Sequence, residues 1–275
     1  MFIQQSTQYI MMNTITFAQN NYTHLTCPID SSDIKDKITV SSLGVKYRNV
    51  EALRNINFEV TGGRVTGIIG PNGAGKSTLI KAMLGLIPGT GKIIYNNQHL
   101  MLQREKVAYV PQRSQIDWTY PATVWDVVMM GRVKKTGWFN PFSKMSKEIA
   151  KDALNKVGML EYCHRPIGQL SGGQQQRVFI ARSLTQQAEI FCFDEPFAGI
   201  DQKTENVIFE IFTELAKMGK IVLVVNHDLG ESITHFDELI LLNKDLIAFG
   251  DRAAVLTQSN LYHAYNGHVA FFSDL

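Results

Sequence analysis

The stretch GPNGAGKST, residues 70–78, constrains this chain more than any other part of its sequence. It fits the pattern G-x-x-x-x-G-K-[ST], in which backbone N–H groups surround phosphate oxygens while the lysine and the hydroxyl contact the outer phosphates and Mg²⁺. The four residues that satisfy the pattern are Gly70, Gly75, Lys76 and Ser77. Apolar residues 65–69 predict a short buried strand before it, and the spacing of residues 79–84 predicts a helix after it. The predicted ligand is the phosphate tail of a nucleotide, held at a helix N-terminus.

The overall composition fits a globular protein with a substantial core. The chain has 275 residues, of which 45% are apolar, and this suits one large or two small domains. The formal net charge of +2 and the 19% of charged residues argue against a dedicated nucleic-acid-binding protein. Cys27, Cys163 and Cys192 are odd in number and lack C-x-x-C spacing, which indicates a reducing compartment and neither a disulfide framework nor a zinc site.

Residues 1–29 contain no charged side chain, yet polar residues interrupt every apolar run among them. They therefore form neither a signal peptide nor a membrane span, and we expect residues 1–36 to be a disordered N-terminal extension. No other segment is long enough to cross a bilayer. A role at a membrane would therefore require docking onto another protein.

Alternation of apolar and polar residues predicts an antiparallel start to the folded part, with strands around 43–47 and 56–60. Further short strands are expected at 92–95 and 106–110. Tyr47 closes the first strand, where its ring could stack on a nucleotide base. A half-buried strand aromatic explains Tyr47 equally well.

From about residue 112 to 180 the pattern changes to helical segments joined by aromatic and Gly/Pro-rich connections, which predicts an inserted helical subdomain. One of its helices has an apolar face and is expected to end at Gly158. Aromatic residues such as Trp118 and Phe139 either fill the core of this subdomain or form a docking groove.

A second glycine-containing segment, LSGGQQQR, covers residues 170–177. Its two glycines are expected to precede a helix that carries Val178, Ile180 and Ala181, and such a helix start favours phosphate. The hydroxyl of Ser171 adds a further donor. The sequence therefore predicts a second anion-binding site.

Two apolar runs, 190–193 and 221–225, predict strands that are buried on both faces. The first delivers Asp194 and Glu195 to its carboxyl end, and the second delivers His227. Ligand and catalytic groups of α/β sheets gather at this edge. We therefore expect these three side chains to serve the nucleotide.

Asp201 is placed as the N-cap of a helix with an apolar stripe that ends at Gly219. Residues 229–257 predict one more helix and two short strands, and residues 258–275 a C-terminal tail. Cys192 is interpreted as a small buried side chain of its strand. His263 and His268 lack a third ligand and are not expected to bind a metal.

Taken in order along residues 37–255, these motifs resemble those of the ATP-binding-cassette (ABC) ATPases. The resemblance implies an α/β fold in a single ATPase domain, residues 37–257, with a phosphate-loop NTPase core that contains a RecA-like sheet, an antiparallel β subdomain and an inserted α-helical subdomain at about 112–180. It also implies hydrolysis of ATP with Mg²⁺. Two chains would form a head-to-tail homodimer, each ATP lying between one phosphate loop and the Ser-Gly-Gly-Gln segment of the other chain.

The resemblance assigns roles to individual residues. It implies that Glu195 is the general base, that His227 contacts the γ-phosphate, and that Gln112 contacts both metal and water. The Mg²⁺ ligands would be Ser77, Gln112 and Asp194. ATP would be bound by Tyr47 and by Gly70, Pro71, Asn72, Gly73, Ala74, Gly75, Lys76, Ser77 and Thr78. The partner chain would add Ser171, Gly172, Gly173, Gln174 and Asp201.

The segments 110–121, 127–132 and 137–139 look like those of the ATPase subunits of bacterial manganese, zinc and iron importers. This implies a peripheral subunit on the cytoplasmic face of the bacterial cell membrane, with manganese the first candidate cargo and iron or zinc the next. Its partners would be a permease and a separate extracytoplasmic metal-binding protein, without nucleic acid. The alternatives are an importer for an iron chelate, haem or cobalamin, and a soluble ABC ATPase outside transport. The uncharged N-terminal extension departs from the family pattern.

Overall fold

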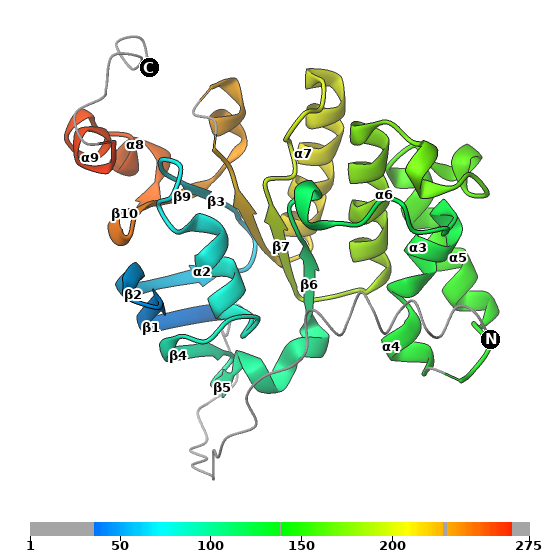
Figure 1. Ribbon diagram of the computed structural model, residues 1–275, viewed down its shortest axis with the longest axis horizontal. Helices are drawn as coiled ribbons and strands as arrows, with labels where there is room; N and C mark the ends of the chain where they lie inside the picture. The colour runs from blue at the N-terminus through cyan, green and yellow to red at the C-terminus, as the bar shows by residue number, and fades with distance from the viewer. Residues whose placement is uncertain (1–35, 138, 228–229, 266–275) are drawn as a thin grey trace.

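Two β-sheets and a group of helices make up the computed structural model, which describes residues 36–137, 139–227 and 230–265 (Figure 1). The larger sheet has the strand order β10-β9-β3-β8-β7-β6. Its strands are β3 (Val65–Ile69), β6 (Val107–Val110), β7 (Ile190–Asp194), β8 (Ile221–Val225), β9 (Glu238–Asn243) and β10 (Asp245–Asp251). All neighbours in it are parallel except β9 and β10, which pair antiparallel.

The central strands are apolar throughout because both faces of the sheet are covered. Every residue of β3, β7 and β8 is buried. Helix α2 (Lys76–Met83) shares one hydrophobic cluster with Cys192, and helix α7 (Gln202–Lys217) covers the opposite face, where Phe212 stacks on Phe193 at 4.3 Å between ring centroids. A strand with two covered faces has no solvent side for polar residues. The predictions for both apolar runs and for the buried Cys192 are confirmed.

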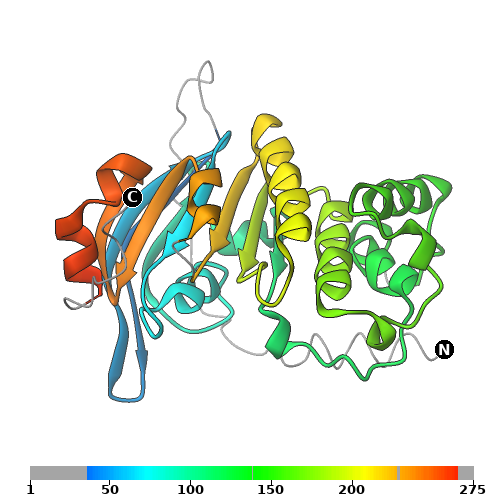
Figure 2. The same ribbon diagram turned by 90° about the horizontal axis from the view of Figure 1, so that it is seen from above.

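The smaller sheet is antiparallel, as predicted, with the order β2-β1-β4-β5. Its strands are β1 (Lys37–Tyr47), β2 (Val50–Thr61), β4 (Thr90–Tyr95) and β5 (Gln98–His99). The inward side chains of β1 and β2 belong to the same cluster as those of α2. Helix α2 is thereby packed between the two sheets, and the tip of the β1–β2 hairpin projects from the body (Figure 2).

The helical region lies at one side of the larger sheet in both views (Figures 1 and 2). Its elements are η2 (Arg113–Gln115), α3 (Val124–Met130), α4 (Val133–Thr136), α5 (Lys144–Lys156), η3 (Leu160–Tyr162), η4 (Ile167–Gln169) and α6 (Gly172–Thr185). Trp118 packs edge-to-face on Phe179 at 5.3 Å, whereas Phe139 is 87% exposed. One of the two aromatic residues therefore contributes to the core, and the other does not.

The start of α6 differs from the prediction. The two glycines lie inside its first turn, because the helix begins at Gly172 with Ser171 as N-cap. The hydroxyl of Ser171 accepts from the backbone N–H of Gln174 at 3.3 Å, and the Gln174 side chain accepts from the Ser171 N–H at 2.9 Å. This capping box satisfies donors of the first turn and offsets the low helix propensity of the glycines.

The connection between β8 and β9 is less helical than predicted. The helix expected after residue 229 is a short 3₁₀ turn, η5 (Glu231–His235), and two short helices follow β10, α8 (Arg252–Val255) and α9 (Gln258–Ala264). The segment predicted as a C-terminal tail therefore begins with a helix. His268 lies outside the described residues.

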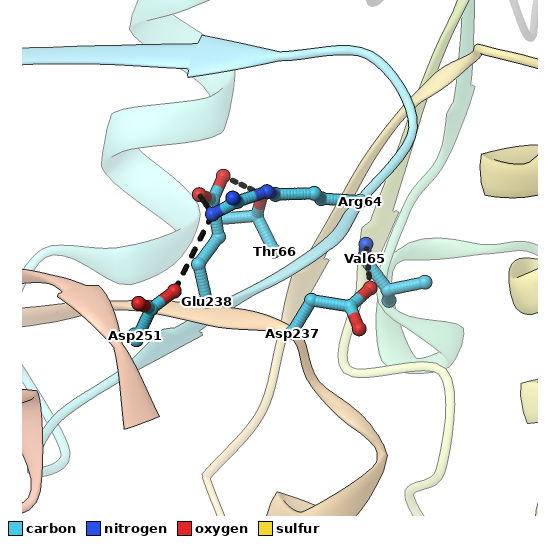
Figure 3. Close-up of polar contacts among 6 residues, drawn as sticks. All are labelled: Arg64, Val65, Thr66, Asp237, Glu238 and Asp251. Atoms are coloured by element: carbon cyan, nitrogen blue, oxygen red, sulfur yellow. Dashed lines mark hydrogen bonds and ion pairs between the residues drawn. The ribbon is translucent and has the colours of Figure 1, made fainter. Parts of the chain in front are cut away.

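A polar network joins the beginnings of β3 and β9 to the end of the antiparallel strand β10 (Figure 3). The buried carboxylate of Glu238 accepts from Thr66 Oγ1 at 2.7 Å and from Arg64 Nη1 at 3.2 Å. Arg64 also lies 3.4 Å from Asp251, and the Asp237 carboxylate accepts from the backbone N–H of Val65 at 2.8 Å. The network fixes the register of the sheet at its amino-terminal edge, away from the carboxyl ends of the strands.

Candidate nucleotide site

Four parallel strands, β3, β6, β7 and β8, end at the same edge of the larger sheet. Residues that follow these strand ends are Gly70 after β3, Gln112 after β6, Asp194 and Glu195 at the end of β7, and His227 after β8. Sequence reasoning had predicted strand-end positions for Asp194, Glu195 and His227. The topology places all of these residues along one edge, where ligands of open α/β sheets bind.

The phosphate loop, residues 70–78, encloses a hollow of about 200 Å³. Its lining consists of Ala52, Asn72, Gly73, Ala74, Gly75, Lys76, Ser77, Thr78 and Glu195. Gly75 has a φ of +98°, and a Cβ there would lie 2.6 Å from Leu53 Cδ2 and 2.8 Å from Ala52 O. Only glycine fits this position. The close approach places the β2 backbone directly behind the loop.

Lys76 closes the loop on itself. Its ammonium donates to Gly70 O at 2.8 Å and to Pro71 O at 3.0 Å. Burial lowers the pKa of Lys76, and the negative charges of Glu195 and Asp194 act in the opposite direction. A phosphate in the hollow would add negative charge beside this ammonium and would favour its protonated form.

Asp194 is fully buried and receives two hydroxyl groups. Ser77 donates to Oδ1 at 2.7 Å, and Tyr109 donates to Oδ2 at 3.3 Å. Burial raises the pKa of Asp194, while the Ser77 hydrogen bond opposes that rise. Burial and the Asp194 charge raise the pKa of Tyr109, so its hydroxyl keeps its proton.

The chemistry of Ser77 and Asp194 fits a magnesium ion. Both offer hard oxygen atoms, which are the ligands that Mg²⁺ prefers. Ser77 lines the phosphate-sized hollow, and Asp194 lies directly behind it at hydrogen-bond distance. A buried carboxylate with a raised pKa is costly to ionise without a nearby cation. The donor set is therefore suited to a metal ion held between protein and phosphate.

Gln112 and Glu195 are joined directly. The Gln112 side-chain amide donates to Glu195 Oε2 at 2.6 Å. Glu195 has a φ of +51°, an uncommon conformation for a residue with a side chain, and its backbone N–H donates to Val225 O at 3.2 Å. The bent backbone after β7 turns this carboxylate over the hollow, whose lining it completes.

Tyr47 and His227 lie at the periphery. Tyr47, at the end of β1, is 48% exposed and is not among the residues that line the hollow. Its ring is accessible to a ligand, and base stacking stays a prediction. His227 is exposed where β8 ends, beside the ends of β3 and β7.

The segment from Ser171 to Gln174 does not line the phosphate hollow of its own chain. A Cβ on Gly173 would lie 3.4 Å from Ile200, next to Asp201, which caps α7 by accepting from Thr204 N at 2.9 Å. Figures 1 and 2 both show α6 on the helical side, apart from α2. The two predicted anion sites are thus separate surfaces of one molecule.

Sequence reasoning missed three residues of this region. Tyr109 contacts Asp194, Ala52 lines the hollow, and Arg113 links the segment after Gln112 to α6 by donating to Gln175 Oε1 at 3.0 Å. The contact of Tyr109 depends on the pairing of β6 with β7, which the sequence does not indicate. Ala52 and Arg113 carry no signal of their own in the sequence.

Among the described residues, no group of three or more His, Cys, Asp and Glu side chains is arranged to hold a metal ion. None of the described helices is long and apolar enough to cross a membrane.

Comparison with known proteins finds relatives that are described as ATP-binding proteins of ABC transporters or metal transport systems. The family profile described as ABC transporter matches residues 53–198. The manganese transport system ATP-binding protein of Halalkalibacterium halodurans is 48% identical over 236 residues, which cover 86% of this chain and 94% of that protein. The zinc transport system ATP-binding protein of Treponema pallidum is 42% identical over 234 residues, covering 85% of this chain and 88% of that protein.

Solved structures agree. An ATP-binding cassette of an ABC transporter in its ADP conformation superposes with a TM-score of 0.73 at 25% identity, covering 85% of this chain and 100% of that one. The dimeric structure of a bacterial ABC transporter cassette superposes with a TM-score of 0.68 at 26% identity, covering 78% and 98%.

Proposed function

The chain belongs to the ABC transporter ATPases, which bind and hydrolyse ATP, and from that premise we propose that it is the ATPase subunit of an importer for divalent metal ions, manganese foremost. The ATPase role is supported by one observation. Lys76, Ser77 and Glu195 line the same hollow, and Asp194 is hydrogen-bonded to Ser77 behind it. The cargo is supported by relatives whose names specify manganese and zinc transport and which align along nearly their whole length.

The phosphate loop would position the ATP phosphates. Its N–H groups and the N-terminus of α2 provide donors, and Lys76 would exchange its bonds to Gly70 O and Pro71 O for bonds to phosphate oxygens. Ser77 and Asp194 would hold Mg²⁺ with help from Gln112. The bound ion would neutralise charge on the outer phosphates.

Glu195 would act as the general base. Its carboxylate lines the hollow and can accept a proton from a water placed beside the γ-phosphate. The amide of Gln112 already fixes the position of Oε2. His227, at the end of the neighbouring strand, would contact the γ-phosphate.

A homodimer would complete the site. Ser171, Gly172, Gly173 and Gln174, with Asp201 nearby, form a surface separate from the phosphate hollow of the same chain. A two-fold pair would bring this surface of one chain onto the hollow of the other, and Tyr47 would stack on the adenine. The dimeric cassette among the similar structures supports this arrangement.

Closure and opening of the dimer would be transmitted to a separate permease, at the cytoplasmic face of the bacterial membrane, with cargo delivered by an extracytoplasmic metal-binding protein. ATPase activity of the chain purified with its permease should rise when the Mn²⁺-loaded binding protein is added. A stable dimer that hydrolyses ATP at full rate without a membrane partner would contradict the proposal.

The cargo is tested separately. A strain that lacks this chain should lose uptake of Mn²⁺, or of Zn²⁺ or Fe²⁺, and regain it when the wild-type chain is supplied. Normal metal uptake together with lost uptake of an iron chelate, haem or cobalamin would keep the importer and change its cargo.

A further inference from the structure

Tyr109 is a partly buried residue next to the nucleotide site, and the proposed function gives it no role. It lies on β6 and pairs in register with Cys192 of β7. Side chains two positions apart on a strand point to the same face, so Tyr109, Cys192 and Asp194 share one face of the sheet. The Tyr109 hydroxyl reaches past Cys192 and donates to Asp194 Oδ2 at 3.3 Å.

The two oxygens of Asp194 have different partners. Oδ1 accepts from Ser77, on the side of the phosphate loop, and Oδ2 accepts from Tyr109, on the side of the sheet. A fully buried carboxylate needs such donors, because water does not reach it. When the Ser77 hydroxyl turns to a metal ion, Tyr109 is the hydroxyl that continues to hold Asp194.

We propose that Tyr109 is a positioning residue for the magnesium site, holding Oδ2 of Asp194 so that Oδ1 faces Ser77 and the phosphate hollow. The proposal rests on the proposed function, which places Mg²⁺ at Ser77 and Asp194. Hydrogen-bond partners of metal ligands commonly orient them and tune their affinity for the ion. Tyr109 acts through Asp194 and does not itself touch nucleotide or metal.

The support is rigid but the bond is long. The Tyr109 ring packs against the hydrophobic cluster that contains Cys192 and Leu79, and its backbone is held in strand β6 by pairing with β7. A distance of 3.3 Å exceeds the usual length of about 2.7–2.8 Å for O–H···O bonds. We therefore expect an effect below the roughly 10–100-fold that loss of such partners typically costs in metal affinity.

The test is Tyr109→Phe, which keeps the ring and removes the hydroxyl. The matched control is Tyr95→Phe, a buried tyrosine of β4 whose hydroxyl interacts with the carboxylate of Asp36, away from the phosphate hollow. Binding of a non-hydrolysable ATP analogue is measured by calorimetry in EDTA and at a series of Mg²⁺ concentrations. No turnover is involved, and melting curves verify that both variants fold.

For Tyr109→Phe we expect unchanged affinity in EDTA and a several-fold rise in the Mg²⁺ concentration that gives half-maximal enhancement of binding. Tyr95→Phe should match the wild type in both. An unchanged Mg²⁺ dependence in Tyr109→Phe would overturn the proposal, and so would an equal loss of affinity with and without Mg²⁺. Asp194→Asn distinguishes failure of the Tyr109 proposal from failure of the proposed metal site. If this variant keeps the wild-type Mg²⁺ dependence, Asp194 does not hold the ion and the metal site of the proposed function is wrong as well.

Discussion

The side-chain amide of Gln112 donates to the Glu195 carboxylate over 2.6 Å, so the group proposed as general base is bound by the residue that begins the helical region. The neighbouring Arg113 in turn donates to Gln175 of α6. A displacement of the helical region would therefore be felt at Glu195 through two consecutive residues. This gives a physical route by which a partner bound to the helices can influence hydrolysis.

Glu195→Gln should abolish turnover and preserve ATP binding. The amide oxygen of the new side chain can still accept from Gln112, so the geometry of the edge is retained while the base is lost. We expect kcat to fall by about 10²–10⁴-fold, the usual contribution of a general base, with the Kd for ATP within a few-fold of wild type. Phosphate release and nucleotide titration measure the two quantities.

The control for this change is Glu210→Gln, an exposed glutamate of α7, which should behave as wild type. An ATP-trapped dimer of Glu195→Gln on gel filtration would support the dimeric mechanism. Turnover near the wild-type rate would remove Glu195 from the role of base.

Asp194→Asn should stabilise the nucleotide-free protein at pH 7 while eliminating hydrolysis. The folded state raises the pKa of Asp194 above its ordinary value of 3.8, so stability is lost as the pH rises through that range and the loss is complete above the folded pKa. Each unit of such a shift costs about 1.4 kcal/mol, which asparagine would recover. Urea unfolding without Mg²⁺ measures the difference.

The pH dependence of unfolding shows whether the stability gained by Asp194→Asn comes from removal of the buried charge. The advantage of Asp194→Asn should shrink as the pH falls toward 3.8, where the aspartate becomes protonated in both states. Asp152→Asn, on the exposed side of α5, should show no comparable gain. Equal or lower stability of Asp194→Asn at pH 7 would contradict the assignment of burial as the dominant cause.

Gly75→Ala should damage the phosphate loop more than Gly73→Ala. Both glycines have positive φ, but a Cβ at Gly75 would collide with Leu53 and with Ala52 O, whereas nothing lies within 4 Å of one at Gly73. Backbone strain of about 1–3 kcal/mol is common to both, and the collision adds to it only at Gly75. Melting curves without nucleotide should rank the two variants in that order. Equal destabilisation would show that the loop moves away from Leu53 at little cost.

Thr66→Val should destabilise the fold without weakening ATP binding. It removes the 2.7 Å hydrogen bond to the buried Glu238 at the edge of the sheet opposite the nucleotide (Figure 3). Hydrogen bonds to charged groups contribute about 1.5–3 kcal/mol, and for this protein size each 1 kcal/mol lowers the Tm by roughly 2–4 °C.

Thr39→Val provides the matched comparison, because Thr39 Oγ1 donates to Glu59 at 2.8 Å in an exposed setting. Its cost should stay within about 0.5 kcal/mol. A similar loss for both variants would mean that burial of Glu238 adds nothing to its hydrogen bond.

Several elements follow from local pattern alone. The run 221–225 coincides with β8, and Asp201 caps α7 as its residue type predicts, because continuous apolar runs and N-cap oxygens act over short distances. The predicted start of α6 was wrong, because the capping box at Ser171 allows the two glycines to lie inside the first turn of the helix.

Contacts that depend on sheet pairing could not be predicted. The bond from Tyr109 to Asp194 requires β6 and β7 to be neighbours in a particular register. The bond from Gln112 to Glu195 requires the same pairing, because these two residues follow the carboxyl ends of the paired strands. Single-sequence patterns contain no information on such distant pairings. The roles of the individual site residues remain predictions that the experiments above address.

The position of β3 between β8 and β9 has a consequence for how the protein is made. Val65 pairs with Val222 and Ile68 with Ile240, while the turn after β9 donates from Lys244 N to Ala74 O within the phosphate loop. Synthesis proceeds from the N-terminus, and closing such long loops is slow. The GKST residues are therefore synthesised early, whereas β8 and β9, the neighbours of the preceding strand β3, are synthesised much later. We therefore expect a nascent chain to bind nucleotide only after strands β8 and β9 have been synthesised.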